Sequence, residues 1–201
     1  MYLLDEKCFP EEISSGEIRT LKQTFGIRRM PEYFLTLLYG AYKMELTPEE
    51  RGELGMIYVS HLGPVNEVHK YVEDLLTYEA EECSPALFSQ SVFNAPLACL
   101  TNNLGIHGSC LSVCGFQNIT ESSVLTAFSW LQSAYCEKVL LIFSDENSGM
   151  AGRISEMTGV QRFKFPHFLL LAEKTNNENA PAFTPEQLIG YIRKQHQLGD
   201  I

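Results

Sequence analysis

Two cysteines and a glutamine lie in the stretch whose residue types come closest to nucleophilic chemistry. Gly108–Phe116 reads GSCLSVCGF, a short apolar run rich in Ser and Cys and bounded by glycines, and Gln117 follows it. A thiol attacks an electrophile only after it ionises, and a nearby helix N-terminus promotes that ionisation. Cys110 and Cys114 are therefore the candidates for covalent catalysis, whereas the amide of Gln117 has no comparable nucleophilicity.

The elements around these residues read as a single supersecondary unit. The glycine-bounded run Gly108–Phe116 predicts a buried strand that ends in a tight turn. Asn118 is the predicted N-cap of a helix over Ile119–Ala134, whose apolar residues do not keep to one stripe, so we expect it to be enclosed on nearly all sides. Val139–Phe143 is a continuous apolar run typical of a parallel sheet. Together they predict a βαβ unit, whose first turn commonly holds the functional residues.

Two motifs in this region resemble those of a known family. Ser91–Pro96 (SVFNAP) matches a Ser followed by an Asn and a small apolar pair, and Gly105–Val113 (GIHGSCLSV) matches the next strand and turn. The sequence from about Gly55 to Lys174 thus resembles the N-terminal half of β-ketoacyl synthases, the condensing enzymes of fatty-acid and polyketide synthesis. The resemblance implies an α/β, thiolase-like half-fold: βαβ units, a mostly parallel or mixed sheet and a buried central helix.

Gln117 is where the chain departs from the family pattern. Counted forward from Val113, the nucleophile cysteine of the family falls on Gln117, and Ala127 and Leu131 match the family helix downstream without a gap. Glutamine is common there in chain-length factors, the catalytically silent partners of ketosynthases, so the resemblance implies a non-condensing subunit. Two alternatives stay open: Gln117 is an ordinary polar residue at a helix start, or Cys114 is a shifted nucleophile. A small buried cysteine is the plainer interpretation of Cys114.

The resemblance also implies catalytic residues that this sequence does not contain. Ketosynthases use two further residues, usually histidines, and a lysine from their C-terminal half, and no His-Gly-Thr or Gly-His context occurs here. His167 lies in an apolar run and is predicted to be a hydrogen-bonded core residue, and His196 is predicted to lie in a polar tail. His61 and His69 are assigned to a loop and a helix surface without a chemical role. The sequence therefore predicts no confident catalytic residue and no cofactor.

Composition narrows the function classes. The net charge is −10, with 25 acidic and 15 basic residues, which argues against a nucleic-acid-binding protein. Six scattered cysteines indicate reduced thiols and a cytoplasmic protein, and Cys110 and Cys114 lack the second pair or nearby His of a metal site. No apolar run is long enough to span a membrane, and the acidic N-terminus lacks the basic region of a secretory signal. Asp145 and Glu146 look like paired carboxylates, but a solvated loop is the expectation.

The chain is expected to form one domain over residues 1–201. Its core is predicted over 52–174, with an N-terminal helical extension over 1–50 and a linker and C-terminal helix over 175–201. Residues 1–29 are expected to cover one edge, and 150–164 to be a loop. The further predicted elements are a helix from Pro31 to Leu46, strand Leu54–Ser60, a helix from Val65 to Leu76, helix Asn94–Asn103, strand Lys164–Lys174 and a helix that begins at Thr184.

Half of a thiolase fold should expose apolar residues that a second half would cover. The interface candidates are Phe93, Asn94, Leu97, Phe128, Trp130 and Leu131, with Leu100 beside them. We expect a homo-oligomer or a complex with a ketosynthase, and an acyl carrier protein is a further candidate partner. Three function classes remain: a chain-length-factor-like subunit, an acyltransferase with a non-standard cysteine, and a module that binds acyl chains or carrier protein.

Overall fold

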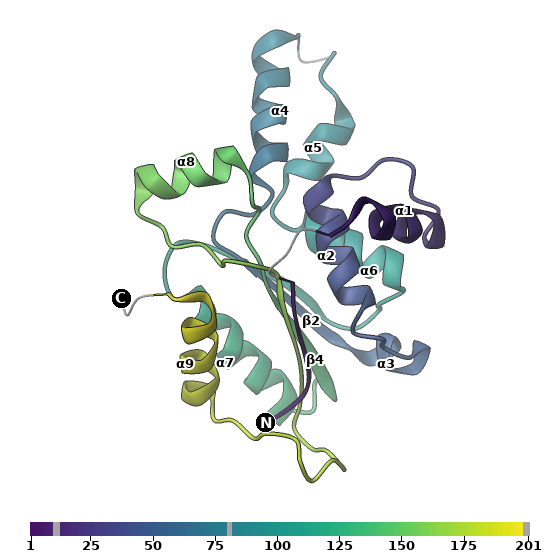
Figure 1. Cartoon of the computed structure of the whole chain (residues 1–201), viewed down its shortest axis with the longest axis vertical. Coiled ribbons are helices and arrows are strands. Elements are labelled where there is room, and N and C mark those ends of the chain that lie inside the picture. The colour runs from purple at the N-terminus through teal and green to yellow at the C-terminus, as the bar shows by residue number, and fades with distance from the viewer. Residues whose placement is uncertain (10–12, 80–81, 199–201) are drawn as a thin grey trace.

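The computed structural model describes residues 1–9, 13–79 and 82–198. In this part of the chain five strands form one mixed sheet in the order β1-β5-β4-β2-β3 (Figure 1). The strands are β1 Tyr2–Cys8, β2 Gly55–Ser60, β3 Cys110–Cys114, β4 Lys138–Phe143 and β5 His167–Ala172. The three strands β2, β3 and β4 are parallel, and β5 is antiparallel to its neighbours β4 and β1. This is the α/β fold class that the sequence predicts.

Nine helices of the described residues accompany the sheet. They are α1 Ser15–Thr24, α2 Glu32–Tyr42, α3 Pro48–Glu53, α4 Val65–Thr77, α5 Pro85–Ser91, α6 Ala95–Leu104, α7 Ile119–Gln132, α8 Gly149–Thr158 and α9 Pro185–His196. Figure 1 shows α7 and α9 on one face of the sheet and α2 and α6 on the other. None of the described helices has the length and apolar character needed to cross a membrane.

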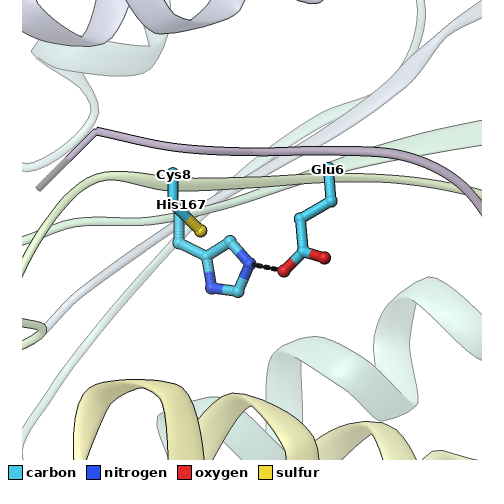
Figure 2. Close-up of side chains that lie close together, drawn as sticks. All are labelled: Glu6, Cys8 and His167. Atoms are coloured by element: carbon cyan, nitrogen blue, oxygen red, sulfur yellow. Dashed lines mark hydrogen bonds and ion pairs between the residues drawn. The ribbon is translucent and has the colours of Figure 1, made fainter.

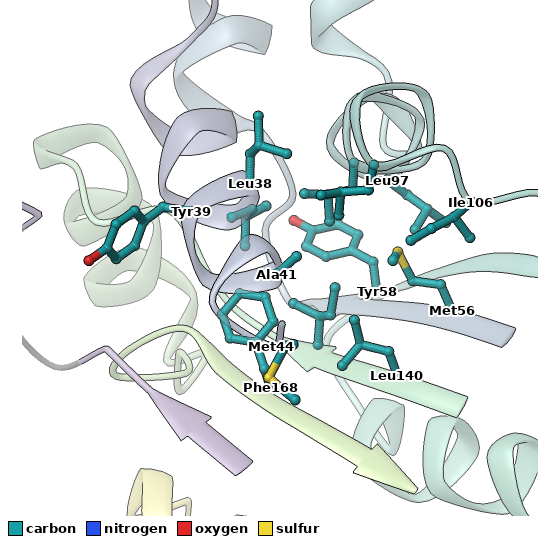
Figure 3. Packing of buried hydrophobic residues seen from close by; sticks show 14 of the residues in the cluster. Leu38, Tyr39, Ala41, Met44, Met56, Tyr58, Leu97, Ile106, Leu140 and Phe168 are labelled. Atoms are coloured by element: carbon teal, nitrogen blue, oxygen red, sulfur yellow. The ribbon is translucent and has the colours of Figure 1, made fainter. Parts of the chain in front are cut away.

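Both faces of the sheet are buried, each against its own helices. Met56, Tyr58, Leu140 and Phe168 point into the core beneath α2 and α6, part of which Figure 3 shows. The alternate positions of the same strands, such as Val59 and Leu141, enter a second core beneath α7 and α9. Strands with two buried faces need apolar residues at successive positions. This explains the continuous apolar runs of β2, β4 and β5.

Helix α2 lies close to β5 because a glycine faces the strand. A Cβ atom added at Gly40 would lie 2.2 Å from Cε2 of Phe168, a ring that is completely buried. The absence of a side chain at Gly40 therefore lets this helix approach the sheet.

The N-terminal region is not the purely helical extension predicted over 1–50. Residues 2–8 form β1, the edge strand beside β5, and α1–α3 follow it. The expectation that residues 1–29 cover an edge agrees with this placement. Part of the linker predicted after residue 174 is bound to the sheet. Leu3 N donates to Pro181 O at 3.0 Å and Phe183 N donates to Met1 O at 2.9 Å, so residues 181–183 are held beside β1.

Three further predictions were wrong. Residues 150–164 are not all loop, because residues 150–158 belong to α8. Ser148 caps this helix by accepting a hydrogen bond from the backbone N–H of Ala151. The strand β3 is partly exposed at the open edge of the sheet, where the sequence predicted a buried strand. Helix α7 is not enclosed on nearly all sides: one face is buried, and Leu125 on the other is 51% exposed.

Helices α4 and α5 project away from the sheet and form what we call the helical arm, residues 65–91 as far as they are described (Figure 1). The two helices pack on one another, with the rings of Tyr71 and Phe88 in contact at 5.5 Å between centroids. Several apolar side chains of the arm stay exposed, including Leu76 at 82% and Phe88 at 54%. The arm therefore offers apolar surface that this chain does not cover.

Candidate functional site

The carboxyl ends of β2, β3 and β4 lie side by side, because the three strands are parallel and β2 lies between the other two. Open α/β sheets form their binding crevices at such a point, where successive connections leave in opposite directions. Three segments meet here: 60–62 at the end of β2, 115–118 after β3 and 144–146 after β4. We call these segments the strand-end site.

Asp145 is the centre of the strand-end site. Its Oδ1 accepts hydrogen bonds from Ser60 Oγ at 2.7 Å and from the backbone N–H groups of His61 and Leu62 at 2.7 and 3.0 Å. Its Oδ2 accepts one from the N–H of Phe163 at 2.9 Å and lies 3.0 Å from Nδ1 of His61. The carboxylate thus joins the ends of β2 and β4 to the segment that precedes β5.

This environment holds Asp145 in its ionised form. Burial alone would raise the pKa of the carboxyl, but the hydrogen bonds from His61, Ser60 and Leu62 outweigh it, so the pKa is lowered. A carboxylate can only accept hydrogen bonds, so Nδ1 of His61 must carry a proton. In the neutral ring the lone pair then lies on Nε2. An Asp–His pair with this proton arrangement orients an imidazole as a hydrogen-bond acceptor.

The expected solvated loop at Asp145 and Glu146 was therefore wrong. Both residues are only 6% exposed. Oε2 of Glu146 accepts from the backbone N–H of Asn66 at 2.8 Å, and burial raises the pKa of the Glu146 carboxyl. The assignment of His61 to a loop surface was also wrong, since its side chain is 9% exposed and packs against Phe163 at 4.5 Å between ring centroids. His69 does lie on a helix surface, beside Glu73.

A cavity of about 450 Å³ opens beside the strand-end site. Its lining includes His61, Gln117, Asn118 and Thr120, together with residues 158–161 and Arg193 of α9. Gln117 is exposed at the start of α7, and Thr120 is buried one residue into the helix. Asn118 is the N-cap residue by position, but its side chain makes no capping hydrogen bond.

The two candidate thiols are not activated. Burial and the negative charge of Asp145 raise the pKa of Cys114 to about 11, and burial raises the pKa of Cys110. Neither thiol would be appreciably ionised near neutral pH. Cys114 is half-buried at the end of β3 and Cys110 is exposed at its start, so the strand separates them from one another.

His167 of β5 and His196 of α9 form a pair of neighbouring histidines. His167 is completely buried on β5, as predicted, and makes two hydrogen-bonded contacts through its ring nitrogens. The prediction of a polar tail for His196 was wrong: the residue is 1% exposed and its ring packs against Phe163 and Phe165. The last turn of α9 buries it because the helix lies along the sheet.

The interface candidates divide into two groups. Phe93 is 57% exposed and Asn94 is exposed, while Phe128 and Trp130 are partly exposed on α7. Leu97 and Leu131 are 4% and 1% exposed and belong to the chain's own two cores, as does Leu100. These three leucines do not reach a partner in this conformation.

The sequence does contain a pattern that predicts the strand-end site. Polar residues stand where two apolar strands end, Ser60-His61 at the end of β2 and Ser144–Glu146 directly after β4. Parallel strands bring such residues together at one edge of a sheet. The hydrogen bonds of Asp145 to backbone N–H groups have no such signal, because they depend on the path of the following loops.

Comparisons with known proteins agree with this geometry. The sequence model of the family described as "Beta-ketoacyl synthase, N-terminal domain" matches residues 18–151, which is 134 of the 201 residues. No curated protein sequence matches the chain significantly.

Solved structures share the fold at low sequence identity. One is a ketosynthase (ApeO) in complex with its chain length factor (ApeC) from Xenorhabdus doucetiae, with a TM-score of 0.60 and 17% identity over 96% of this chain and 92% of that chain. A second is the ishigamide ketosynthase/chain length factor, with a TM-score of 0.64 and 11% identity over 79% of this chain and 49% of that chain. A third is AntDE:AntF, a type II PKS acyl-carrier protein in complex with its ketosynthase bound to the hexaketide. It has a TM-score of 0.58 and 14% identity over 83% of this chain and 51% of that chain.

The chain thus spans about half the length of the second and third of these structures and nearly all of the matched chain in the first. The thiolase-like α/β fold that the motifs implied is confirmed, and so is the resemblance to the N-terminal half of a ketosynthase. By the family match over two thirds of its sequence, this chain belongs to the β-ketoacyl synthase family, through that family's N-terminal domain.

Proposed function

We propose that this chain is a non-condensing, chain-length-factor-like partner of an active ketosynthase in polyketide or fatty-acid biosynthesis. The observation that carries the proposal is the exposed amide of Gln117 beside the cavity, just before α7, at the position that the sequence resemblance assigns to the family's nucleophile cysteine. An amide cannot form the acyl-enzyme bond on which condensation depends. The protonated thiols of Cys110 and Cys114 offer no replacement.

The similar structures support partnership with a ketosynthase. Two of them pair a ketosynthase with a chain length factor, and one of those two contains a chain of nearly the same length as this one. The surface that we assign to the ketosynthase includes the open edge of the sheet at β3, which no other strand of the described residues covers. Unpaired strand edges are templates for pairing with another chain.

Intact-mass spectrometry tests the loss of condensation. The full chain is incubated with malonyl- and acyl-loaded carrier protein, with and without a co-expressed ketosynthase. We expect no acyl adduct on this chain and a changed product length or yield when the ketosynthase is present. The variant Gln117→Cys places a thiol at the helix start and should gain an adduct, while Gln117→Asn is the matched control that should not.

An adduct on the wild-type chain would favour the second candidate, an acyltransferase with a non-standard nucleophile. Cys114→Ser and Cys110→Ser would then locate the acylated sulfur, since the adduct should disappear in only one of them. If no adduct forms and the ketosynthase products stay the same, the subunit role is wrong. Binding of the carrier protein by this chain alone would then point to the third class, a carrier-protein module.

A further inference from the structure

Three side chains with metal-binding donor atoms converge on the sheet face beneath α9. Glu6 and Cys8 are two residues apart on β1, so they point to the same face, and Cys8 lies directly opposite His167 of β5. Figure 2 shows the three side chains turned toward one another, with Nε2 of His167 and Oε1 of Glu6 2.6 Å apart. The Sγ of Cys8, a carboxylate oxygen of Glu6 and a ring nitrogen of His167 all lie within 4.8 Å of one another.

Residues of α9 hold two members of this Glu6–Cys8–His167 cluster in place. The hydroxyl of Tyr191 lies 2.9 Å from each carboxylate oxygen of Glu6. Nδ1 of His167 lies 3.3 Å from Nε2 of His196. Metal-binding histidines and carboxylates in proteins are usually held by such outer hydrogen bonds. The cluster therefore has the ligand atoms of a metal site, and α9 supplies an outer partner to two of its three members.

We propose that Glu6, Cys8 and His167 bind a zinc ion that joins β1 to β5. A thiolate, an imidazole and a carboxylate form a mixed donor set of the kind that zinc accepts. Cys8 is exposed at the end of β1, which gives the ion access and leaves a fourth position for water. On binding, the Cys8 thiol loses its proton to solvent as the Zn–S bond forms, and no oxidant or reductant is involved.

The side chains must move slightly to coordinate the ion. Zinc–ligand bonds of roughly 2.0–2.3 Å in a tetrahedron place the donor atoms roughly 3.3–3.8 Å apart. The 2.6 Å contact between His167 and Glu6 must open, and the widest donor pair must close by at most about an ångström. Rotation about the side-chain bonds of Glu6 and Cys8 can do both, since neither residue is completely buried.

The hydrogen bonds around His196 predict a specific consequence of binding. The backbone N–H of Lys164 donates to Nδ1 of His196 at 3.2 Å, so neutral His196 carries its proton on Nε2 and donates to Nδ1 of His167. The proton of His167 then lies on Nε2, the atom that zinc needs. Zinc binding must move the proton of His167 from Nε2 to Nδ1. The proton of His196 must then move from Nε2 to Nδ1 as well, the atom that faces the Lys164 N–H. The Lys164 N–H then loses its acceptor, a small loss beside coordination by three ligands.

Zinc binding is measured on the chelator-treated full chain without any ketosynthase, so the outcome is independent of the proposed subunit role. We expect one zinc ion per chain by elemental analysis and a higher Tm when zinc is added. Cobalt(II) in place of zinc should give a thiolate-to-cobalt charge-transfer band in the near ultraviolet. Cys8→Ser should abolish the band and the Tm shift, whereas Cys110→Ser removes another exposed thiol and should leave both unchanged.

Two further measurements separate a site from loose binding. Tyr191→Phe keeps all three ligands and should weaken zinc binding about 10-fold, because Glu6 loses its outer hydrogen bonds. The amide signal of Lys164 in a nitrogen–proton NMR spectrum should shift on zinc addition. Less than stoichiometric zinc on the wild-type chain, or a cobalt spectrum that is the same in Cys8→Ser, would overturn the proposal.

Discussion

At the scale of single residues, Asp145 shows how one buried charge can organise a site. Five hydrogen-bonded contacts converge on its two oxygens, from the ends of β2 and from the segment before β5. Breaking a buried, hydrogen-bonded charge network is among the larger effects a single substitution can have. The residue therefore contributes to stability as well as to the orientation of His61.

Asp145→Asn should lower the free energy of unfolding by about 3 kcal/mol at neutral pH, because the amide cannot accept at both positions. Chemical denaturation measures the change. Asp5→Asn is the matched control: this carboxylate is 36% exposed and pairs with Lys7 on the surface, so its loss should cost about 0.5 kcal/mol or less. Equal losses in the two variants would contradict the role given to Asp145.

The same residue predicts a dependence on pH. The pKa of Asp145 in the folded chain is lowered from its ordinary value, because the hydrogen bonds to the carboxylate outweigh the effect of burial. Its contribution to stability is therefore complete at neutral pH and is lost as the pH falls through the folded-state pKa. The difference in unfolding free energy between the wild-type chain and Asp145→Asn should shrink as the pH falls below about 3.9. A difference that stays constant between pH 7 and pH 3 would show that the charge is not responsible.

At the scale of elements, the sequence predicted those whose pattern is local. The helices α4, α6 and α9 and the strands β2 and β4 follow from apolar periodicity and from capping residues such as Thr184, whose capping box is present. The strand β1 was missed because Asp5, Glu6 and Lys7 interrupt its alternation, and it is a strand only through pairing with β5 far along the chain. The burial of His196 was missed because it depends on contacts with Phe163, Phe165 and His167, outside its own polar segment.

A pair of glycine substitutions tests the packing of helices on the sheet. Gly40→Ala should destabilise the chain by about 2 kcal/mol or more, because the new Cβ overlaps the buried ring of Phe168. Gly190→Ala on the exposed side of α9 meets no atom within 4 Å and should stabilise by about 0.5–1 kcal/mol. Thermal unfolding of both variants checks the signs. A neutral Gly40→Ala would mean that α2 does not approach β5 as closely as described.

At the scale of the whole molecule, the surface carries apolar residues that the chain does not cover. Phe93 precedes α6 and is 57% exposed, next to the helical arm with its own exposed apolar side chains. Patches of this kind mark interaction sites in soluble proteins. If the proposed partnership with a ketosynthase is right, the region that includes Phe93 and Asn94 should contribute to the contact.

Phe93→Ser should weaken binding to the ketosynthase by about 2 kcal/mol, or roughly 30-fold, because aromatic side chains at interface centres carry much of the binding energy. Met157→Ser is the matched control, since Met157 is 85% exposed on α8, away from α5 and α6. Surface plasmon resonance with the ketosynthase immobilised gives both affinities. If Met157→Ser weakens binding and Phe93→Ser does not, the contact lies elsewhere on the molecule.

The pairing of β1 with β5 has a consequence for synthesis on the ribosome. The contact between Glu6 and His167 spans 161 residues of sequence. At ribosomal rates of roughly 5–20 residues per second, β1 waits roughly 10–30 s for its partner strand to emerge. An unpaired strand that waits so long is open to wrong pairing with other nascent chains. Asp5, Glu6 and Lys7 interrupt the apolar alternation of β1. Charged segments of this kind keep an unpaired strand from aggregating.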